Sequence, residues 1–168
     1  MSKKDKKDKK EKKGETAKKG SGQIEKLKIL LLGETAVGKT CIIHQFTNEK
    51  FLENSISTIG IDCQQKSITV GEQEVLLMMW DTAGQERYQF LPKQYYQNAD
   101  GIFIVFSLIE KATFDKISKW IEQIKTNVSM KLPIILVGNK CDLEARDVQV
   151  EDIKKMCNDI QTTYKIKI

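Results

Sequence analysis

The sequence predicts an α/β domain with a largely parallel sheet, and three observations carry this prediction. From Ile24 onward, short apolar runs alternate with amphipathic helical stretches. Two of the runs, GIFIVFS and PIILVG, are apolar along their whole length, as are strands that are covered on both faces. A loop with two glycines connects the first run to the first helical stretch. A chain of 168 residues is expected to form one such domain.

The first half of the domain is expected to contain three strands and one helix. Residues 27–32 predict a strand, and residues 40–48 predict a helix that is followed by an irregular segment up to residue 59. Residues 61–70 and 74–80 are β-rich runs with a Gly71-Glu72 turn between them. This spacing predicts an antiparallel hairpin.

The second half is expected to contain two buried strands, two helices and a last strand. Residues 101–107 and 133–138 predict the buried strands. One helix is expected between them, from apolar residues at helical spacing: Phe114, Ile117, Ile121 and Ile124. Residues 151–160 repeat the helical pattern. In residues 162–168, TTYKIKI, apolar residues alternate with lysines, which predicts a sixth strand.

Positive charge is concentrated in residues 1–23. This segment has ten lysines and four acidic residues, which gives it a net charge of +6. The whole chain has a net charge of +5, so residues 24–168 carry −1. Because no large apolar residue follows Met1, the segment is expected to be a disordered tail. Such a tail fits either an arm drawn to an anionic membrane surface or a solubilising extension, and we expect no nucleic-acid partner.

Composition excludes several other classes of protein. The four cysteines have no CxxC spacing and His44 is the single histidine, so a metal cage of cysteine and histidine is not expected. No run of eighteen apolar residues is present, and Ser2 stands where myristoylation needs glycine. We therefore expect a cytoplasmic protein.

The loop LLLGETAVGKT matches the phosphate-binding pattern G-x-x-x-x-G-K-[ST]. Its glycines let consecutive backbone N–H groups wrap an anion, Lys39 offers a charge to the β- and γ-phosphates, and the Thr40 hydroxyl is a ligand suited to Mg²⁺. An ordinary turn is the alternative, but the flanking strand and helix favour the phosphate loop. The nucleotide-binding residues expected here are Gly33, Glu34, Thr35, Ala36, Val37, Gly38, Lys39, Thr40 and Cys41.

The tetrapeptide NKCD follows the PIILVG strand, at the end of a parallel sheet where ligands bind. The Asp142 carboxylate can accept two hydrogen bonds from guanine, whereas adenine offers no such pair of donors. Asn139, Lys140 and Asp142 are therefore expected to bind the base, although these residue types are also common in turns.

The segment DTAGQE follows the VLLMMW run. Asp81 is expected to hold a water on Mg²⁺, Gly84 to donate a backbone N–H to the γ-phosphate, and Gln85 to orient the attacking water as the catalytic residue. Thr58 is expected to close on Mg²⁺ only when that phosphate is present. Loss of the phosphate would then release both loops, which makes a switch.

Together, GETAVGKT, STIGID, WDTAGQE and NKCDL resemble the small GTPases of the Ras superfamily, and the Rab family in particular. The resemblance implies a P-loop NTPase fold with six strands, one of them antiparallel, and binding of GTP or GDP with Mg²⁺. It also implies a role in vesicle traffic with exchange factors, GTPase-activating proteins and effectors, at the cytosolic face of endomembranes. Phe51 would lie edge-on to the guanine. The effector and switch surface implied is Ile59, Gly60, Ile61, Trp80 and Tyr95.

No arginine lies between Thr40 and Thr58, so slow intrinsic hydrolysis that depends on an activating protein is expected. A non-cycling Rab-like interaction module, or an inactive fragment, is the alternative function. An ATPase of another P-loop class is disfavoured by NKCD.

The sequence departs from the family pattern at Cys63, at Ser55 and Ser107, and after residue 168. Ser55 stands where an aromatic residue is common, and Ser107 where aspartate is usual. Cys63 stands where Rab proteins usually have a phenylalanine that packs with the counterparts of Trp80 and Tyr95. After a strand like YKIKI, the family continues into a Ser-Ala loop, a final helix and prenylated cysteines. We therefore expect a domain that is incomplete at its C-terminus, without the final helix and without a prenylation site in this chain.

Overall fold

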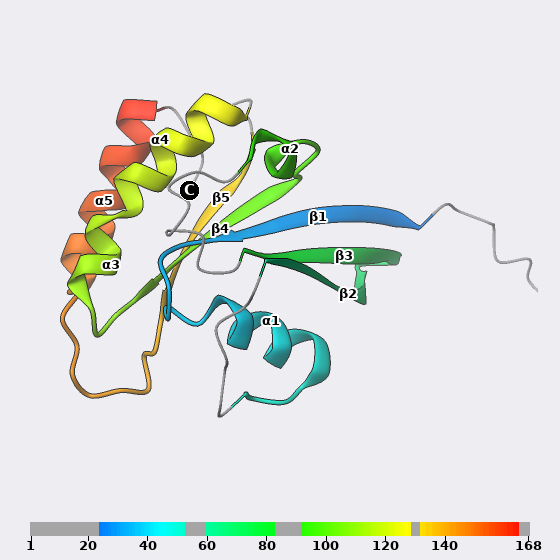
Figure 1. The fold of residues 1–168 in the computed structure, drawn as a ribbon, viewed down its shortest axis with the longest axis horizontal. Coiled ribbons are helices and arrows are strands. Elements are labelled where there is room, and N and C mark those ends of the chain that lie inside the picture. Colours follow the sequence, from blue (N-terminus) through cyan, green and yellow to red (C-terminus); the bar gives the residue numbers. More distant parts are fainter. Residues whose placement is uncertain (1–23, 53–59, 83–91, 129–131, 165–168) are drawn as a thin grey trace, which may run out of the picture.

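The computed structural model describes residues 24–52, 60–82, 92–128 and 132–164. Within them lies a five-stranded sheet with the strand order β2-β3-β1-β4-β5 (Figure 1). The strands are β1 (Glu25–Leu32), β2 (Ile61–Val70), β3 (Gln73–Thr82), β4 (Gly101–Ser107) and β5 (Ile134–Asn139). Strand β1 is parallel to β3 and β4, β4 is parallel to β5, and β2 is antiparallel to β3. The predicted α/β fold with one antiparallel strand is confirmed.

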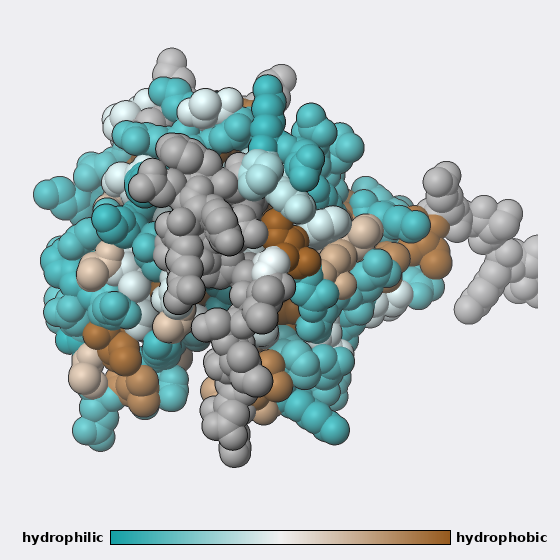
Figure 2. Space-filling model, in the orientation of Figure 1, coloured by the Kyte–Doolittle hydropathy of each residue, from teal (hydrophilic) through white to brown (hydrophobic). Residues whose placement is uncertain are grey.

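Helices cover both faces of the sheet. The helices are α1 (Lys39–Asn48), α2 (Lys93–Tyr96), α3 (Lys111–Asp115), α4 (Ile117–Asn127) and α5 (Val150–Tyr164). Helix α1 lies on one face, and α3, α4 and α5 lie on the other (Figure 1). On the surface in this view, most of the described residues are hydrophilic, and apolar side chains form small patches (Figure 2). Within the described ranges, no helix is long and apolar enough to cross a membrane.

The two central strands supply side chains to both layers of the core, because successive residues of a strand point to opposite faces. From β1, Leu30 and Leu32 join the cluster under α2 to α5, whereas Leu31 joins the cluster under α1. From β4, Ile104 joins the cluster under α2 to α5, and Val105 joins the cluster under α1. Burial on both faces explains why β4 is apolar along its length, and why β1 is apolar over its last four residues, 29–32.

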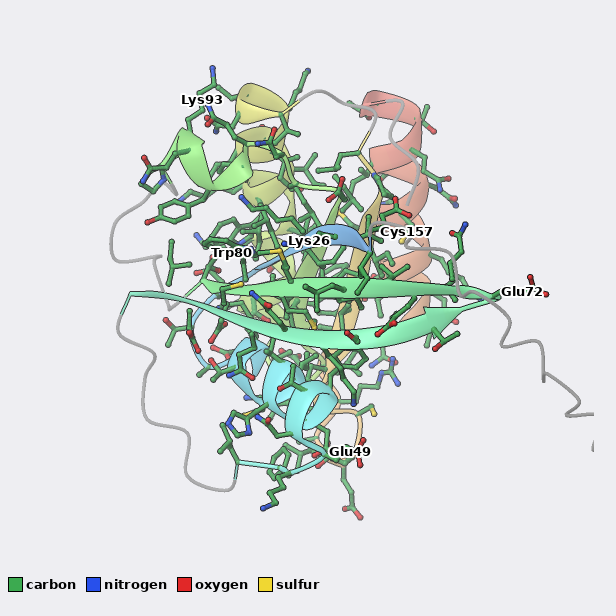
Figure 3. The ribbon with its side chains drawn as sticks, turned by 90° about the vertical axis from the view of Figure 1, so that its right-hand side faces the viewer. Lys26, Glu49, Glu72, Trp80, Lys93 and Cys157 are labelled. Carbon is green, nitrogen blue, oxygen red and sulfur yellow. The ribbon has the colours of Figure 1, made fainter. Side chains whose placement is uncertain are left out.

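The hairpin β2–β3 was predicted at Gly71 and Glu72, and the structure confirms it. Gly71 has a φ of 63°, which the turn requires and which glycine adopts without strain. Figure 3 shows Glu72 in this turn, at the end of the hairpin away from Trp80, with Glu49 of α1 and Cys157 of α5 on opposite sides of the sheet.

The prediction of one helix around Phe114 and Ile124 was wrong. The structure has two helices, α3 and α4, with Lys116 between them. All four residues of the predicted stripe are buried in one cluster, so the apolar spacing continues across the break. Periodicity detects the buried stripe and not the interruption of backbone hydrogen bonding. The short helix α2 was not predicted.

The predicted sixth strand at residues 162–168 is also corrected. Residues 162–164 are the last turn of α5, and residues 165–168 lie outside the described part. The helix continues past the buried Ile160 because no glycine or proline follows to end it before Tyr164. The sheet therefore has five strands in the described residues, and not the six that were expected.

Candidate nucleotide-binding site

The loop between β1 and α1 has a backbone that only glycine can form at two of its positions. Gly33 and Gly38 have φ values of 140° and 98°. A Cβ atom at Gly33 would collide with the carbonyl oxygen of Val105, and one at Gly38 with the side-chain nitrogen of Asn139. The loop therefore packs closely against β4 and β5, and its two motif glycines are required by space as well as by φ.

Lys39 is buried within this loop. Its side chain is 6% exposed, and its Nζ donates hydrogen bonds of 2.7 Å to the carbonyl oxygens of Gly33 and Glu34. These bonds fix the ammonium group in the bend of the loop and at the start of α1. A positive charge and backbone N–H groups at a helix N-terminus together form a site for phosphate.

Thr40 and Asp81 bring two oxygen ligands together beside Lys39. The Thr40 hydroxyl donates a hydrogen bond of 2.5 Å to Oδ2 of Asp81, which is 3% exposed at the end of β3. A hydroxyl and a carboxylate are the oxygen ligands that Mg²⁺ prefers, so the residues present fit this ion. Thr58, the third expected ligand, lies outside the described residues.

Asn139 connects the end of β5 to the phosphate loop. Its side-chain nitrogen donates a hydrogen bond of 2.8 Å to the carbonyl oxygen of Val37, a residue that is fully buried. Lys140 follows with a φ of 64°, and Asp142 is exposed in the next turn. The structure thus brings Asn139, the first residue of NKCD, beside the phosphate loop.

Comparison with known proteins agrees with this arrangement of loops. A model of the Ras family matches residues 28–166. The chain belongs to the Ras family. The similar proteins include Ras-related protein Rab-13 of Bos taurus, 41% identical over 133 residues, which are 79% of this chain and 66% of that protein. Rab11A of Lotus japonicus is 40% identical over 129 residues, 76% of this chain and 57% of that protein.

Ras-related protein Rab-15 of Homo sapiens is 42% identical over 119 residues, which are 71% of this chain and 56% of that protein. The chain therefore spans between about half and two thirds of the length of the curated relatives it matches. These similarities confirm the resemblance to the Rab family of small GTPases.

Thr82 is a residue of this Ras-family site that sequence reasoning did not select. It is 3% exposed, and its hydroxyl donates a hydrogen bond of 2.6 Å to the carbonyl oxygen of Leu31. This bond ties the end of β3 to β1 just before the phosphate loop. Its place in DTAGQE, next to Asp81, was the available signal. Gly84 and Gln85 of the same motif lie outside the described residues.

Trp120 is a second residue that the sequence did not assign to the site. Its indole Nε1 donates a hydrogen bond of 3.1 Å to Oε1 of Glu34, across 86 residues of sequence. In the sequence it stands beside the apolar stripe of its helix, which predicts core packing alone. No local signal indicates a contact with the phosphate loop.

Phe51, which is expected to lie edge-on to the guanine, follows the end of α1. Phe51 is 68% exposed, which leaves its ring free to contact a ligand. Cys41 is half-buried, with its Sγ 4.0 Å from the carbonyl oxygen of Leu52. The contact of Phe51 with the base and that of Cys41 with the nucleotide stay predictions.

The expected effector surface contains an aromatic pair. The rings of Trp80 and Tyr95 meet edge to face, with centroids 6.4 Å apart at 60°. Lys28 Nζ lies 4.7 Å from the Trp80 ring centroid, and Cys63 is the cross-strand neighbour of Trp80. This register places the Cys63 side chain next to that of Trp80 in the expected effector surface.

Charge near this pair is modified by partial burial. Burial lowers the pKa of Lys28, although nearby Cys63 and Asp100 act in the opposite direction. Burial, with a smaller effect of Asp62, raises the pKa of the Cys63 thiol. Of the other expected residues of this surface, Gly60 is exposed and Ile61 is half-buried, whereas Ile59 lies outside the described residues.

Proposed function

We propose that this protein is a Rab-type molecular switch that binds GTP and GDP and hydrolyses GTP to GDP. The observation that carries the proposal is the hydrogen bond from Asn139 to Val37, because it joins the base-binding motif to the phosphate loop. The two motifs then form one site in which a guanine and a polyphosphate fit together.

Each part of the nucleotide has residues suited to it. The backbone of residues 33–38 and the ammonium of Lys39 bind the phosphates, and the Asp142 carboxylate recognises guanine. Mg²⁺ would be held by Thr40, by Thr58 and, through a water, by Asp81. When bound, this ion neutralises charge on the β- and γ-phosphates.

Hydrolysis is assigned to Gln85, which orients the attacking water. The N–H of Gly84 and the hydroxyl of Thr58 respond to the γ-phosphate, so its loss changes the conformation of both loops. No arginine lies between Thr40 and Thr58, so the chain has no arginine finger in this segment to stabilise the transition state. An activating protein would supply roughly 10³- to 10⁵-fold of rate.

In the cell, the switch would act in vesicle traffic, as a cytoplasmic protein that associates peripherally with endomembranes. Exchange factors and GTPase-activating proteins would drive its cycle, and effectors would bind around Trp80 and Tyr95. The +6 charge of residues 1–23 would add attraction to anionic lipids.

Single-turnover hydrolysis of bound GTP tests the proposal. The wild-type chain should convert GTP to GDP slowly with Mg²⁺, and Gln85→Leu should slow the conversion roughly tenfold or more while GTP stays bound. Gln97→Leu, at an exposed position after α2, is the matched control and should match the wild type. Tight GTP binding with no conversion by the wild type would favour the non-cycling interaction module instead.

A further inference from the structure

The phosphate loop is held from two sides by side chains of other elements. On the β5 side, Asn139 donates to the carbonyl oxygen of Val37. On the α4 side, the indole of Trp120 donates to the carboxylate of Glu34 at 3.1 Å. The first contact belongs to the base-binding motif, whereas the second has no role in the proposed nucleotide chemistry.

The contact between Trp120 and Glu34 is well placed to fix the loop. The Trp120 side chain is 7% exposed and packs in the core cluster under α4, so its position is set by the fold. An indole N–H can only donate, and a buried donor that loses its acceptor costs free energy. A hydrogen bond to a carboxylate is also stronger than one between neutral groups.

Glu34 is fixed through its backbone as well as its side chain. Its carbonyl oxygen accepts a hydrogen bond of 2.7 Å from Lys39 Nζ, and its carboxylate accepts the bond from Trp120. The residue therefore lies between α4 and the cation that is to bind phosphate.

We propose that Trp120 is a positioning residue that holds the phosphate loop through Glu34 and thereby slows the release of GDP and GTP. This inference rests on the proposed function, because it concerns the same nucleotide site. It assigns to helix α4, through Trp120, an effect on how long the nucleotide stays bound.

The rate of GDP dissociation tests this inference in the 168-residue chain. Trp120→Phe removes the N–H and keeps most of the ring, and Glu34→Ala removes the acceptor. Each should speed the release of a fluorescent GDP analogue roughly three- to thirtyfold, the range expected for loss of one charge-assisted hydrogen bond that is partly replaced by water. Because both remove the same bond, the double variant should release GDP no faster than the faster single variant.

Phe114→Leu is the control for general loosening of the core. Phe114 is buried and packs edge to face on Phe106, on the same side of the sheet as Trp120. This variant should lower the melting temperature and leave the dissociation rate within about twofold of the wild type.

Nuclear magnetic resonance of the ¹⁵N-labelled indole groups provides a readout that does not depend on nucleotide release. In Glu34→Ala, the Trp120 indole resonance should shift and its proton should exchange faster with water, whereas the Trp80 resonance should not. A tryptophan that served only as core packing would show neither change.

The possible outcomes separate this inference from the proposed function. Unchanged GDP release in both single variants, from a wild-type chain that binds GDP, overturns the inference alone. A wild-type chain that retains no guanine nucleotide overturns the proposed function, and the inference with it. If Trp120→Phe does not fold, Glu34→Ala decides, because its substitution lies in the loop and leaves the core intact.

Discussion

Among single residues, Lys39 contributes the positive charge of the phosphate loop. Its ammonium group is buried and hydrogen-bonded to two loop carbonyls. Lys39→Met should therefore weaken GDP binding by roughly 100-fold or more, because a charge-assisted contact with phosphate is lost in a buried site. Lys66→Met is the matched control, since Lys66 on β2 donates to Phe46 and pairs with Glu49. Equilibrium titration with a fluorescent GDP should show loss of affinity in the first variant only.

Tyr96 makes a prediction about stability. It is 2% exposed, and its hydroxyl has no hydrogen-bond partner among the residues that the structure describes. Burial raises its pKa to about 12, from about 10 in an unfolded chain. The folded state therefore holds this proton more tightly, so the contribution of Tyr96 to the free energy of unfolding is intact below about pH 10 and lost as the pH rises toward the higher value.

Tyr96→Phe should remove this part of the alkaline loss of stability. At pH 7 the variant should be as stable as the wild type or more so, because a buried hydroxyl without a partner is removed. Urea denaturation at neutral pH and near pH 11 measures both effects. A loss of more than about 1 kcal/mol at neutral pH would show that the hydroxyl has a partner after all.

At the scale of single residues, the sequence predicts the local motifs and not the contacts between them. Gly33, Gly38 and Lys39 fall in one pattern, because a phosphate loop needs those residue types at fixed spacing. The bonds from Trp120 to Glu34 and from Thr82 to Leu31 join distant segments. Such pairings depend on how the elements pack, which no local pattern contains.

At the scale of elements, the strand β4 was predictable because it is buried on both faces and its sequence is a continuous apolar run. In β1 the apolar run is confined to its buried second half. The division between α3 and α4 was not predictable from the sequence, because the buried apolar stripe of the two helices continues across Lys116. Helix α2 has four residues, which is too short for a periodic pattern to show. The end of α5 was misread because alternation over a few residues fits a strand as well as a helix.

The end of α5 supplies a prediction of its own. Thr162 and Thr163 are exposed in its last turn. Replacing both by alanine should raise the free energy of unfolding by about 0.5 to 1 kcal/mol, because alanine has a higher helix propensity than threonine. In a strand the same change should be destabilising, since threonine is the better strand former. Urea denaturation decides, and a decrease in stability would contradict the helix.

For the whole molecule, the site is a consequence of the parallel sheet. The carboxyl ends of β1, β3 and β5 lie at the same edge, so the loops that follow them meet. Two hydrogen bonds connect these loops, one from Thr40 to Asp81 and one from Asn139 to Val37. We propose that these loops together bind a guanine nucleotide.

Base specificity tests this claim most directly. Equilibrium binding of GDP, ADP and xanthosine diphosphate should be measured with Mg²⁺ for the wild type and for Asp142→Asn. The wild type should bind GDP roughly 10³-fold or more tightly than ADP, because adenine lacks the two donors that the carboxylate accepts. Asp142→Asn should lose affinity for GDP and gain it for xanthosine diphosphate, whose base has an oxygen in place of the amine. Equal affinity of the wild type for GDP and ADP would contradict the account.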